Sequence, residues 1–177
     1  MCVIETSPVV ETRRLTLRAP GVQDVSRIAA LANDADVARM TMRMPHPFAV
    51  QDAEAFVIQV AAQDPARAIA FLIEHEDLGP VGIIGLHESE DLAPEAGYWI
   101  GREYWGRGVA TEALEGALVW ASRRWKRRAL MAGHFTDNPA SGRVLEKAGF
   151  LYTGETRPAF SLARGEETQV RRMVWLA

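Results

Sequence analysis

The sequence has little cysteine, no long hydrophobic run and no excess of basic charge, and each shortage argues against a class of protein. Its only cysteine, Cys2, cannot form an internal disulfide, which fits a reducing compartment. Apolar runs such as residues 68–73 are far below the roughly 18 residues needed to cross a bilayer. The N-terminus carries Glu5 where a secretory signal needs basic residues. We therefore expect a cytoplasmic protein with no membrane segment.

The formal net charge of -3 gives no general attraction to nucleic acid, which requires clustered Lys and Arg in surplus. One dense basic run falls where a helix should end, and cations there complement the negative end of the helix dipole. The run consists of Arg123, Arg124, Lys126, Arg127 and Arg128. We interpret it as a solvated helix end. We therefore expect no nucleic-acid partner. No cluster of Cys, His and Asp has metal spacing, so we expect no metal either.

The length of 177 residues with 48% hydrophobic composition suits one packed core, so we expect residues 1–177 to form a single domain. Alternating or β-rich apolar runs predict strands at 11–18, 68–73, 81–86, 96–100, 129–135, 150–153 and 170–176. Helical patterns cover 22–31, 35–40, 50–62 and 108–125, and Asn138-Pro139 opens one more helix. A loop with Pro158 and Gly165 separates the last two strands. This is a mixed α/β fold of about seven strands, largely antiparallel, and about five helices.

The most informative segment runs from the strand at 96–100 through a glycine-rich turn into a helix. Gly106 and Gly108, followed by small Ala110, let backbone amides point inward without obstruction by side chains. The helix start adds a partial positive charge, so the turn is suited to hold phosphate, and Arg107 can add a charged contact. Tight strand-to-helix turns also favour glycine, so this pattern alone has low specificity.

Two nucleotide-binding motifs fail on the same residues. A Walker loop needs Lys and then Ser or Thr after its last glycine, whereas Val109 follows Gly108. A dinucleotide fingerprint needs glycine at position 111 and a parallel βαβ unit, whereas Thr111 follows an antiparallel meander. A nucleotide-binding protein is therefore the weakest of the candidate functions.

Three segments together resemble the GNAT superfamily of N-acetyltransferases. They are residues 98–113, Asn138-Pro139-Ala140-Ser141 and Lys147-Ala148-Gly149-Phe150. The chain is most similar to the branch that acetylates the N-termini of ribosomal proteins at alanine or serine, and the resemblance covers nearly all of it. It implies a GNAT-like acyl-CoA N-acyltransferase fold, with acetyl-CoA as co-substrate and an amine as acceptor.

The resemblance also implies which residues bind the coenzyme. The glycine turn would bind the pyrophosphate, the preceding strand would splay from its neighbour and bind the pantetheine arm, and an asparagine would contact the same arm. In this sequence these residues are Arg107, Gly108, Val109, Ala110 and Thr111, then Tyr98, Trp99 and Ile100, and then Asn138. A glycine inside a strand, here Gly97, independently marks a close backbone approach. Asn138 also suits a helix cap.

Two positions depart from the family pattern. Trp105 replaces the usual Gln or Arg, so coenzyme binding would depend more on the backbone. Leu145 stands where many members have the tyrosine that protonates the departing thiolate. Ser141, in the first turn of its helix, is our replacement for that acid, although a serine there is also compatible with a helix start.

The acceptor amine must lose a proton to a base. Glu95, at the head of the strand expected to meet the thioester, is our first choice, and His87, His134 and Glu90 are alternatives. We expect His46 to pack or to line the acceptor cleft. The acceptor stays open between a protein N-terminus and a small amine, and a homodimer stays open as well. A non-catalytic acyl-CoA-binding or interaction module is the alternative to an enzyme.

Overall fold

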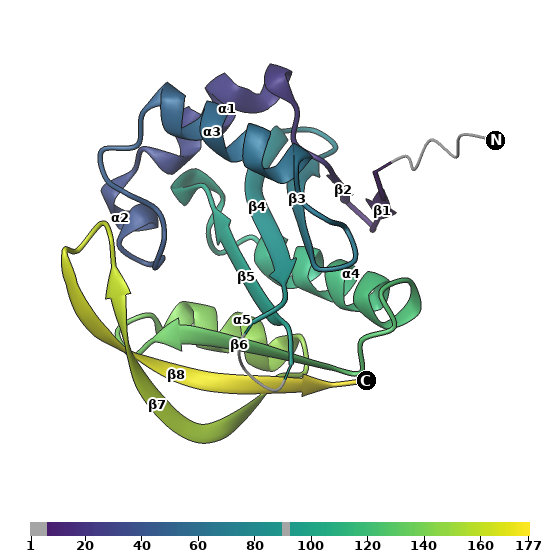
Figure 1. Ribbon diagram of the computed structural model, residues 1–177, viewed down its shortest axis with the longest axis vertical. Coiled ribbons are helices and arrows are strands. Elements are labelled where there is room, and N and C mark those ends of the chain that lie inside the picture. Colours follow the sequence, from purple (N-terminus) through teal and green to yellow (C-terminus); the bar gives the residue numbers. More distant parts are fainter. Residues whose placement is uncertain (1–6, 90–92) are drawn as a thin grey trace.

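The computed structural model describes residues 7–89 and 93–177, and its centre is one eight-stranded sheet. The spatial order of the strands is β1-β2-β3-β4-β5-β6-β8-β7, and every neighbouring pair is antiparallel except β5 with β6 (Figure 1). The strands are β1 (Val10–Glu11), β2 (Leu15–Arg18), β3 (Ala68–His75), β4 (Gly79–His87), β5 (Glu95–Ile100), β6 (Ala129–Phe135), β7 (Leu151–Ser161) and β8 (Glu166–Leu176).

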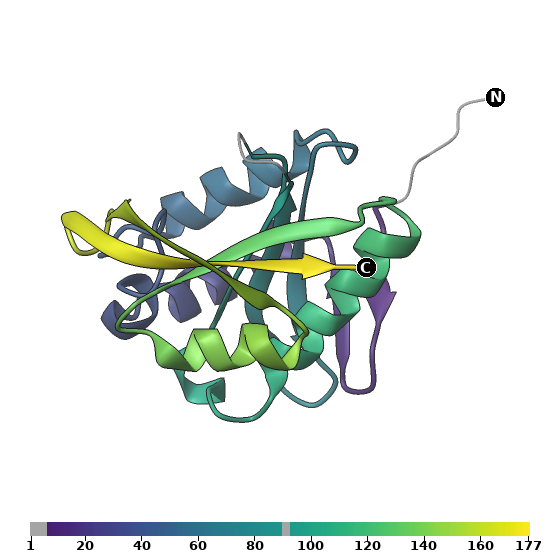
Figure 2. The ribbon, with the colours of Figure 1, turned by 90° about the horizontal axis from the view of Figure 1, so that it is seen from below.

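Helices cover both faces of the sheet (Figure 2). On one face lie α1 (Val25–Ala32) and α3 (Val50–Ala61), with the short α2 (Ala35–Ala38) between them in sequence. On the other face lie α4 (Val109–Arg123) and α5 (Pro139–Lys147). Two 3-10 turns, Val22–Asp24 and Arg102–Tyr104, precede α1 and α4. The fold is the mixed α/β arrangement that the sequence predicts.

Each face of the sheet buries its own apolar cluster because side chains alternate along the strands. The cluster beneath α4 and α5 includes Phe71, Leu86 and Leu114, all fully buried. The cluster beneath α1 and α3 is smaller and includes Ile28 and Leu72. The buried residues of α4 recur at 3.6-residue spacing, so this helix turns one apolar face to the core.

Two predictions about strands are wrong in detail. Residues 11–18 form a hairpin of β1 and β2 instead of one strand, because the chain turns at 12–14. Residues 154–161, expected in a loop with Pro158, extend β7 to 11 residues. Pro158 is tolerated there because β7 is the edge of the sheet, where a missing N–H breaks no ladder bond. The sheet therefore has eight strands where we expected about seven.

The sheet opens between β5 and β6. These strands share a single bridge, Glu95 with Met131, and the amide of Met131 donates to the carbonyl of Pro94 at 2.8 Å. Beyond that point the two strands diverge (Figure 1). The neighbouring pairs β4–β5 and β6–β8 stay in register along six and seven residue pairs, respectively. The split is therefore local to one junction.

The tip of the β7–β8 hairpin is fastened to the loop after α2. Arg164 donates to the carboxylate of Asp137 at 2.8 and 3.0 Å and to the carbonyl of Arg39 at 2.7 Å. Its guanidinium also lies 4.7 Å from the ring centroid of Phe135. The loop after α2 is thereby held against the end of β6.

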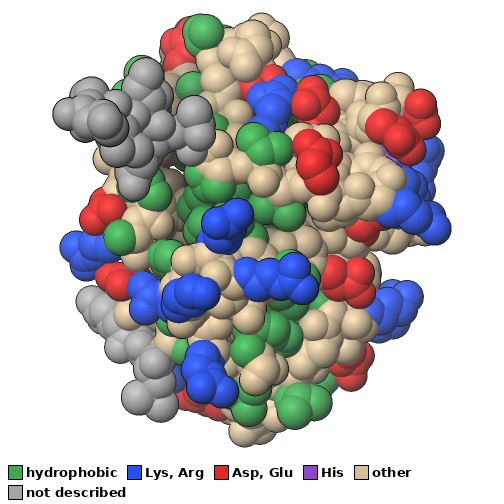
Figure 3. All heavy atoms as spheres, turned by 90° about the vertical axis from the view of Figure 1, so that its right-hand side faces the viewer, with side chains coloured by type: hydrophobic (Ala, Val, Ile, Leu, Met, Phe, Trp, Pro, Cys, Tyr) green, Lys and Arg blue, Asp and Glu red, His purple; other side chains and the backbone are tan. Residues whose placement is uncertain are grey.

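Basic side chains gather on the face where α4 ends (Figure 3). Arg123, Arg124, Lys126 and Arg128 are exposed, while Arg127 is half-buried and pairs with Glu88 at 3.1 Å. No helix in the described part of the chain is long and apolar enough to cross a membrane.

Candidate active site

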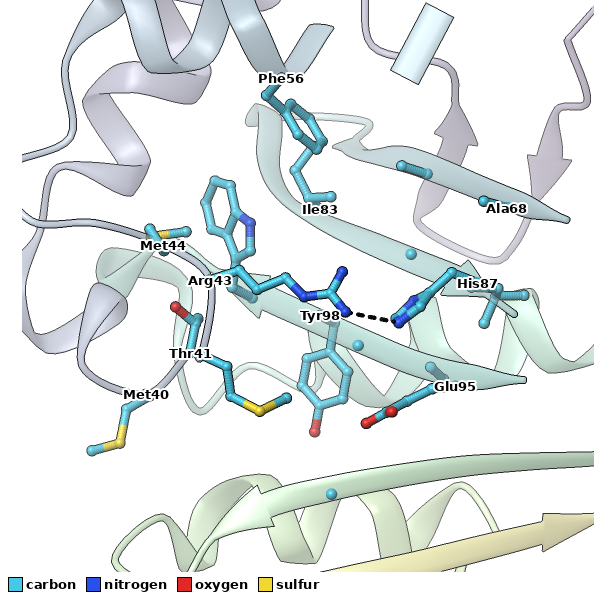
Figure 4. Close-up of a pocket in the computed structure, with 18 of the residues that line it drawn as sticks. Met40, Thr41, Arg43, Met44, Phe56, Ala68, Ile83, His87, Glu95 and Tyr98 are labelled. Carbon is cyan, nitrogen blue, oxygen red and sulfur yellow. Dashed lines mark hydrogen bonds between the residues drawn. The ribbon is translucent and has the colours of Figure 1, made fainter. Parts of the chain in front are cut away.

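A cavity of about 780 Å³ lies on the α1–α3 side of the sheet and reaches the opening between β5 and β6 (Figure 4). One wall comes from the loop after α2 and from α3, and it is rich in methionine and aromatic side chains. These are Met40, Met42, Met44, Phe48 and Phe56. The floor between them is low because Gly85 of β4 pairs with Gly97 of β5, and a side chain at Gly97 would meet no atom within 4 Å.

The backbone of β5 presents polar groups to the opening. The amide of Gly101 donates to the carbonyl of Val81 at 2.8 Å, and hydrogen bonds alternate along an antiparallel ladder. The N–H and C=O groups of Tyr98 and Ile100 therefore face away from β4, whereas those of Trp99 face β4. The outward Ile100 carbonyl accepts from the indole of Trp105 at 2.7 Å. The backbone groups of Tyr98 are thus the ones best placed to bind an extended ligand in the opening between β5 and β6.

The N-terminus of α4 is left without a cap. Gly108 stands at the cap position with φ of 76° and supplies no side chain. The amides of Arg107, Gly108, Val109, Ala110 and Thr111 donate to no acceptor among residues 7–89 and 93–177. Orphan amides at a helix start, together with the helix dipole, form an anion site. This is the geometry that the glycine turn predicts.

A clamp of three residues, two from the β1–β2 turn and one from α4, supports this turn. The side chain of Arg14 donates to the carbonyl of Arg107 at 3.3 Å and forms an ion pair with Glu112 at 2.7 Å. Glu112 also accepts from the hydroxyl of Thr12 at 2.8 Å and from the amide of Arg14 at 2.7 Å. Burial raises the pKa of the Glu112 carboxyl, but these donors together lower it by more. The pKa of Glu112 therefore lies below its ordinary value.

Ser141 is fixed in the first turn of α5. The side-chain oxygen of Asn138 caps the helix by accepting from the amide of Ser141 at 3.2 Å, as the sequence predicts. The Ser141 hydroxyl lies 2.9 Å from the hydroxyl of Tyr98 across the opening. Burial raises the pKa of Tyr98 to about 12, against the hydrogen bond to Ser141, so the phenol stays protonated. The hydroxyls of Tyr98 and Ser141 therefore meet beside the opening between β5 and β6. Leu145, at the position of the family tyrosine, has no hydroxyl to add.

Charged groups meet at the opposite end of β5. His87, the last residue of β4, pairs in register with Glu95, the first residue of β5. Glu95 accepts from Arg172 of β8 at 2.9 Å, and these two side chains are only 16% and 6% exposed. Arg43 reaches across the cavity to within 3.4 Å of Nε2 of His87 (Figure 4). Burial lowers the pKa of His87, Arg43 lowers it further, and Glu95 opposes both.

The other candidate bases are placed less favourably. Both ring nitrogens of buried His134 have partners, since Nδ1 lies 2.8 Å from the carbonyl of Phe135 and Nε2 lies 3.0 Å from the Tyr152 hydroxyl. His46 is exposed and does not line the cavity, contrary to our expectation, although its neighbour Pro45 does. Glu90 and Cys2 lie outside the described residues.

The structure brings together only some of the residues predicted from sequence. Glu95, Tyr98, Trp99 and Ser141 line the cavity, whereas Ile100, Asn138 and residues 107–111 lie outside its lining. Three features escaped the sequence reasoning, namely the Tyr98 hydroxyl, Arg43 and the Arg172 partner of Glu95. Alternation along β5 could have indicated the first, because it turns the Tyr98 side chain toward α5. Among the described residues, no group of His, Cys, Asp and Glu could hold a metal ion.

Comparison with known proteins agrees with this geometry. The acetyltransferase (GNAT) domain matches residues 14–151. The chain is 31% identical over 154 residues to the uncharacterised N-acetyltransferase YoaA of Bacillus subtilis (strain 168), covering 85% of this chain and 86% of the relative.

Two solved structures share the fold. One is RimL, a ribosomal-protein alpha-N acetyltransferase in complex with coenzyme A, with a TM-score of 0.83 and 18% identity over 96% of this chain and 98% of that one. The other is spermidine N-acetyltransferase from Vibrio cholerae with coenzyme A and spermine, with a TM-score of 0.77 and 21% identity over 93% and 96%. The open sheet and the uncapped helix are thus those of an acetyl-CoA-dependent N-acetyltransferase, and the chain belongs to the GNAT acetyltransferase family.

Proposed function

We propose that this enzyme transfers the acetyl group of acetyl-CoA directly to a primary amine, and that the amine is the N-terminus of a protein or peptide. The observation that carries the proposal is the meeting of the cavity with the split between β5 and β6 at Ser141. The amine enters from the α1–α3 side and the coenzyme from the other, so both substrates reach one point. Positioning of this kind removes much of the barrier without a covalent enzyme intermediate.

The coenzyme would be held chiefly by the backbone. The amides of Arg107, Gly108, Val109, Ala110 and Thr111 receive the pyrophosphate, and the backbone of Tyr98 and Ile100 receives the pantetheine arm. A single helix dipole contributes only about 0.3 to 1 kcal/mol at an exposed site, so several amides act together. Asn138 acts mainly through its cap on α5, which fixes Ser141.

Ser141 would protonate the departing thiolate. Its hydroxyl can lose a proton to sulfur and recover one from Tyr98, which lies 2.9 Å away and stays protonated at neutral pH. This pair replaces the tyrosine that is absent at Leu145. A backbone amide of β5 polarises the acetyl carbonyl, and such a preorganised donor is worth several kcal/mol in a site without bulk water.

The charges of the cavity favour a peptide N-terminus over a polyamine. Among the described residues, the carboxylates that line it are Asp52 and Glu95, and each already accepts a hydrogen bond. Asp52 accepts from the amide of Ala49 at 2.7 Å, and Glu95 pairs with Arg172. A polyamine carries several cations that need free carboxylates, whereas the methionine and aromatic wall suits the first side chains of a peptide.

The test measures release of free thiol from acetyl-CoA. The acceptors compared are short peptides that begin with Ser or Ala, and spermidine. N-acetylated forms of the same peptides are the negative control. We expect turnover only with the free peptides. Faster turnover of spermidine would overturn the acceptor assignment. Binding of acetyl-CoA without thiol release from any amine would favour a non-catalytic acyl-CoA-binding module. ATP and NAD serve as controls, since neither should produce the thermal shift that acetyl-CoA produces.

A further inference from the structure

We infer that His87 is the general base of this enzyme and that Arg43 holds its Nε2 unprotonated until the acceptor amine displaces the guanidinium. This assignment rests on the proposed function, because it deepens the same acetyl transfer. It replaces our first choice of Glu95. The argument depends on which groups at the head of β5 are free to accept a proton.

Glu95 is poorly suited to accept one. Its Oε1 takes a hydrogen bond from Nη1 of Arg172 at 2.9 Å, and both side chains are nearly buried. Protonating that carboxylate would leave the charged guanidinium of Arg172 beside a neutral partner in a site with little water, which is strongly unfavourable. Glu95 therefore serves better as a fixed negative charge beside the base than as the base itself.

His87 has the geometry that Glu95 lacks. It lines the same cavity as Ser141 and stands opposite Glu95 in the β4–β5 ladder. A guanidinium can only donate, so the contact from Nη2 of Arg43 makes Nε2 of His87 the acceptor and puts the ring proton on Nδ1. The imidazole thus presents an unprotonated nitrogen to the cavity (Figure 4).

The contact with Arg43 is weak enough to be exchanged. Its length of 3.4 Å is near the limit for a hydrogen bond, and the Arg43 side chain is exposed. An amine N–H is also a donor, so the acceptor can take the place of the guanidinium on Nε2. Arg43 is therefore a positioning residue, because it keeps the lone pair directed into the cavity without taking part in the transfer.

The proton balance is complete. The amine nitrogen forms a bond to the acetyl carbon, and the bond from that carbon to sulfur breaks. The proton lost by the amine passes to Nε2 of His87, and the thiolate takes a proton from Ser141. Tyr98 then returns a proton to Ser141, and exchange with water returns His87 to its neutral form and restores the Tyr98 hydroxyl. The negative charge of Glu95 stabilises the imidazolium while it exists.

The surroundings of His87 set the pH at which it can act. Burial and Arg43 lower its pKa, and Glu95 opposes them, so the neutral form persists to a lower pH than for a free imidazole. Among the described residues, the other charged groups around it are Arg172 behind Glu95, Asp52 on α3, which accepts from the amide of Ala49, and Glu88 with its partners Arg67 and Arg127. Removing Arg43 should therefore raise the pKa of His87, and removing the Glu95 charge should lower it.

The first experiment compares turnover by the whole enzyme with a free Ser-initiated peptide. A base of this kind contributes about 10²- to 10⁴-fold, so His87→Gln should lower kcat/KM at pH 7 by about 100-fold or more. The matched control is His46→Gln, which changes an exposed histidine outside the cavity and should keep the wild-type rate. A His87→Gln enzyme within about twofold of wild type would overturn the proposal.

The second experiment measures the pH dependence of kcat/KM for wild type and Arg43→Gln with the same peptide. The pKa of the acceptor amine is common to both enzymes, so any displacement between them reports on the protein. The acidic limb should move to higher pH in Arg43→Gln. An unmoved limb, or a move to lower pH, would overturn the role of Arg43.

The third experiment separates this proposal from the proposed function. The His87 ring signal, assigned by its loss in His87→Gln, is titrated by NMR with coenzyme A bound and no acceptor. We expect a pKa below the ordinary histidine value of 6.5, and a rise in Arg43→Gln. A pKa at or above 6.5 in the wild type would overturn the proposal even if peptides are acetylated. Absence of thiol release with normal NMR behaviour would instead overturn the acceptor assignment.

Discussion

Helices α4 and α5 begin beside the same open junction of the sheet, yet only α5 is closed by its own side chain. Asn138 caps α5 through the amide of Ser141, and Pro139 occupies its first helical position. α4 begins at Gly108 with no side-chain cap and orphan amides. Both helix starts need acceptors for their free N–H groups. The chain supplies an acceptor of its own at α5, whereas the amides of α4 stay open for the coenzyme pyrophosphate that we propose they bind.

The largest expected effect tests the capped helix. Ser141→Ala should lower kcat by about 100-fold, because it removes the proton donor for the thiolate while the backbone cap from Asn138 remains. The dissociation constant of acetyl-CoA, measured by calorimetry, should stay nearly unchanged. Ser26→Ala, at an exposed position of α1, is the matched control and should retain full activity. An unchanged kcat in Ser141→Ala would show that the capped start of α5 does not hold a proton donor for the thiolate.

The next effect tests the uncapped helix. Gly108→Val places a β-branched residue at a φ of 76°, which should turn the amides of the loop away from a common point. We expect the dissociation constant of coenzyme A to rise about tenfold, equivalent to about 1.4 kcal/mol.

Gly154→Val is the matched control for that substitution. Gly154 has a φ of 85° in the edge strand β7, with open space around it, so the change carries the same kind of backbone strain outside the glycine turn. Equal affinity for coenzyme A in the two variants would contradict the anion site.

The contrast between the helices also shows what a sequence can reveal. Asn138-Pro139 and the glycines at 106 and 108 act locally, so a reader of the sequence can place both helix starts within a residue or two. The antiparallel meander is local for the same reason. By contrast, the prediction of a loop at Pro158 is wrong. A proline is tolerated in this strand because β7 lies at the sheet edge, which is a property of the whole topology.

The candidate site was less accessible to such reading. Arg14 and Glu112 form an ion pair across 98 positions, and Arg172 meets Glu95 across 77. No periodicity links residues so far apart. The Glu95 hypothesis rested on its place at the head of β5, and that place is correct. The sequence could not reveal that β8 brings Arg172 to Glu95. With Glu95 paired, Nε2 of His87 is the nitrogen that we propose as the proton acceptor.

A smaller effect would sharpen the role of the cap on α5. Asn138→Ala removes the acceptor for the Ser141 amide and should lower the free energy of unfolding by about 1 kcal/mol, as loss of a helix cap does. Urea denaturation measures that loss. Because the first turn of α5 loosens, kcat should also fall several-fold.

The matched control is Asp34→Ala, which removes the cap of α2 by taking away the acceptor for the amides of Asp36 and Val37. It should cost similar stability and leave kcat close to wild type. A kcat that falls equally in both variants would mean that the cap on α5 has no special connection with Ser141.

The smallest expected effect concerns the clamp beneath α4. Glu112→Gln keeps an oxygen for Thr12 and the Arg14 amide but removes the charge that pairs with Arg14, so it should cost less than about 1 kcal/mol at pH 7. The folded-state pKa of Glu112 is depressed, so its contribution is present above the ordinary value of 4.5 and is lost as pH falls through the folded value. Urea denaturation should therefore separate the two proteins at pH 7 and bring them together at strongly acidic pH. Glu115→Gln, an exposed change on the same helix, should show no such difference at either pH. If wild type and Glu112→Gln differ equally at both pH values, the clamp acts through packing and not through its charge.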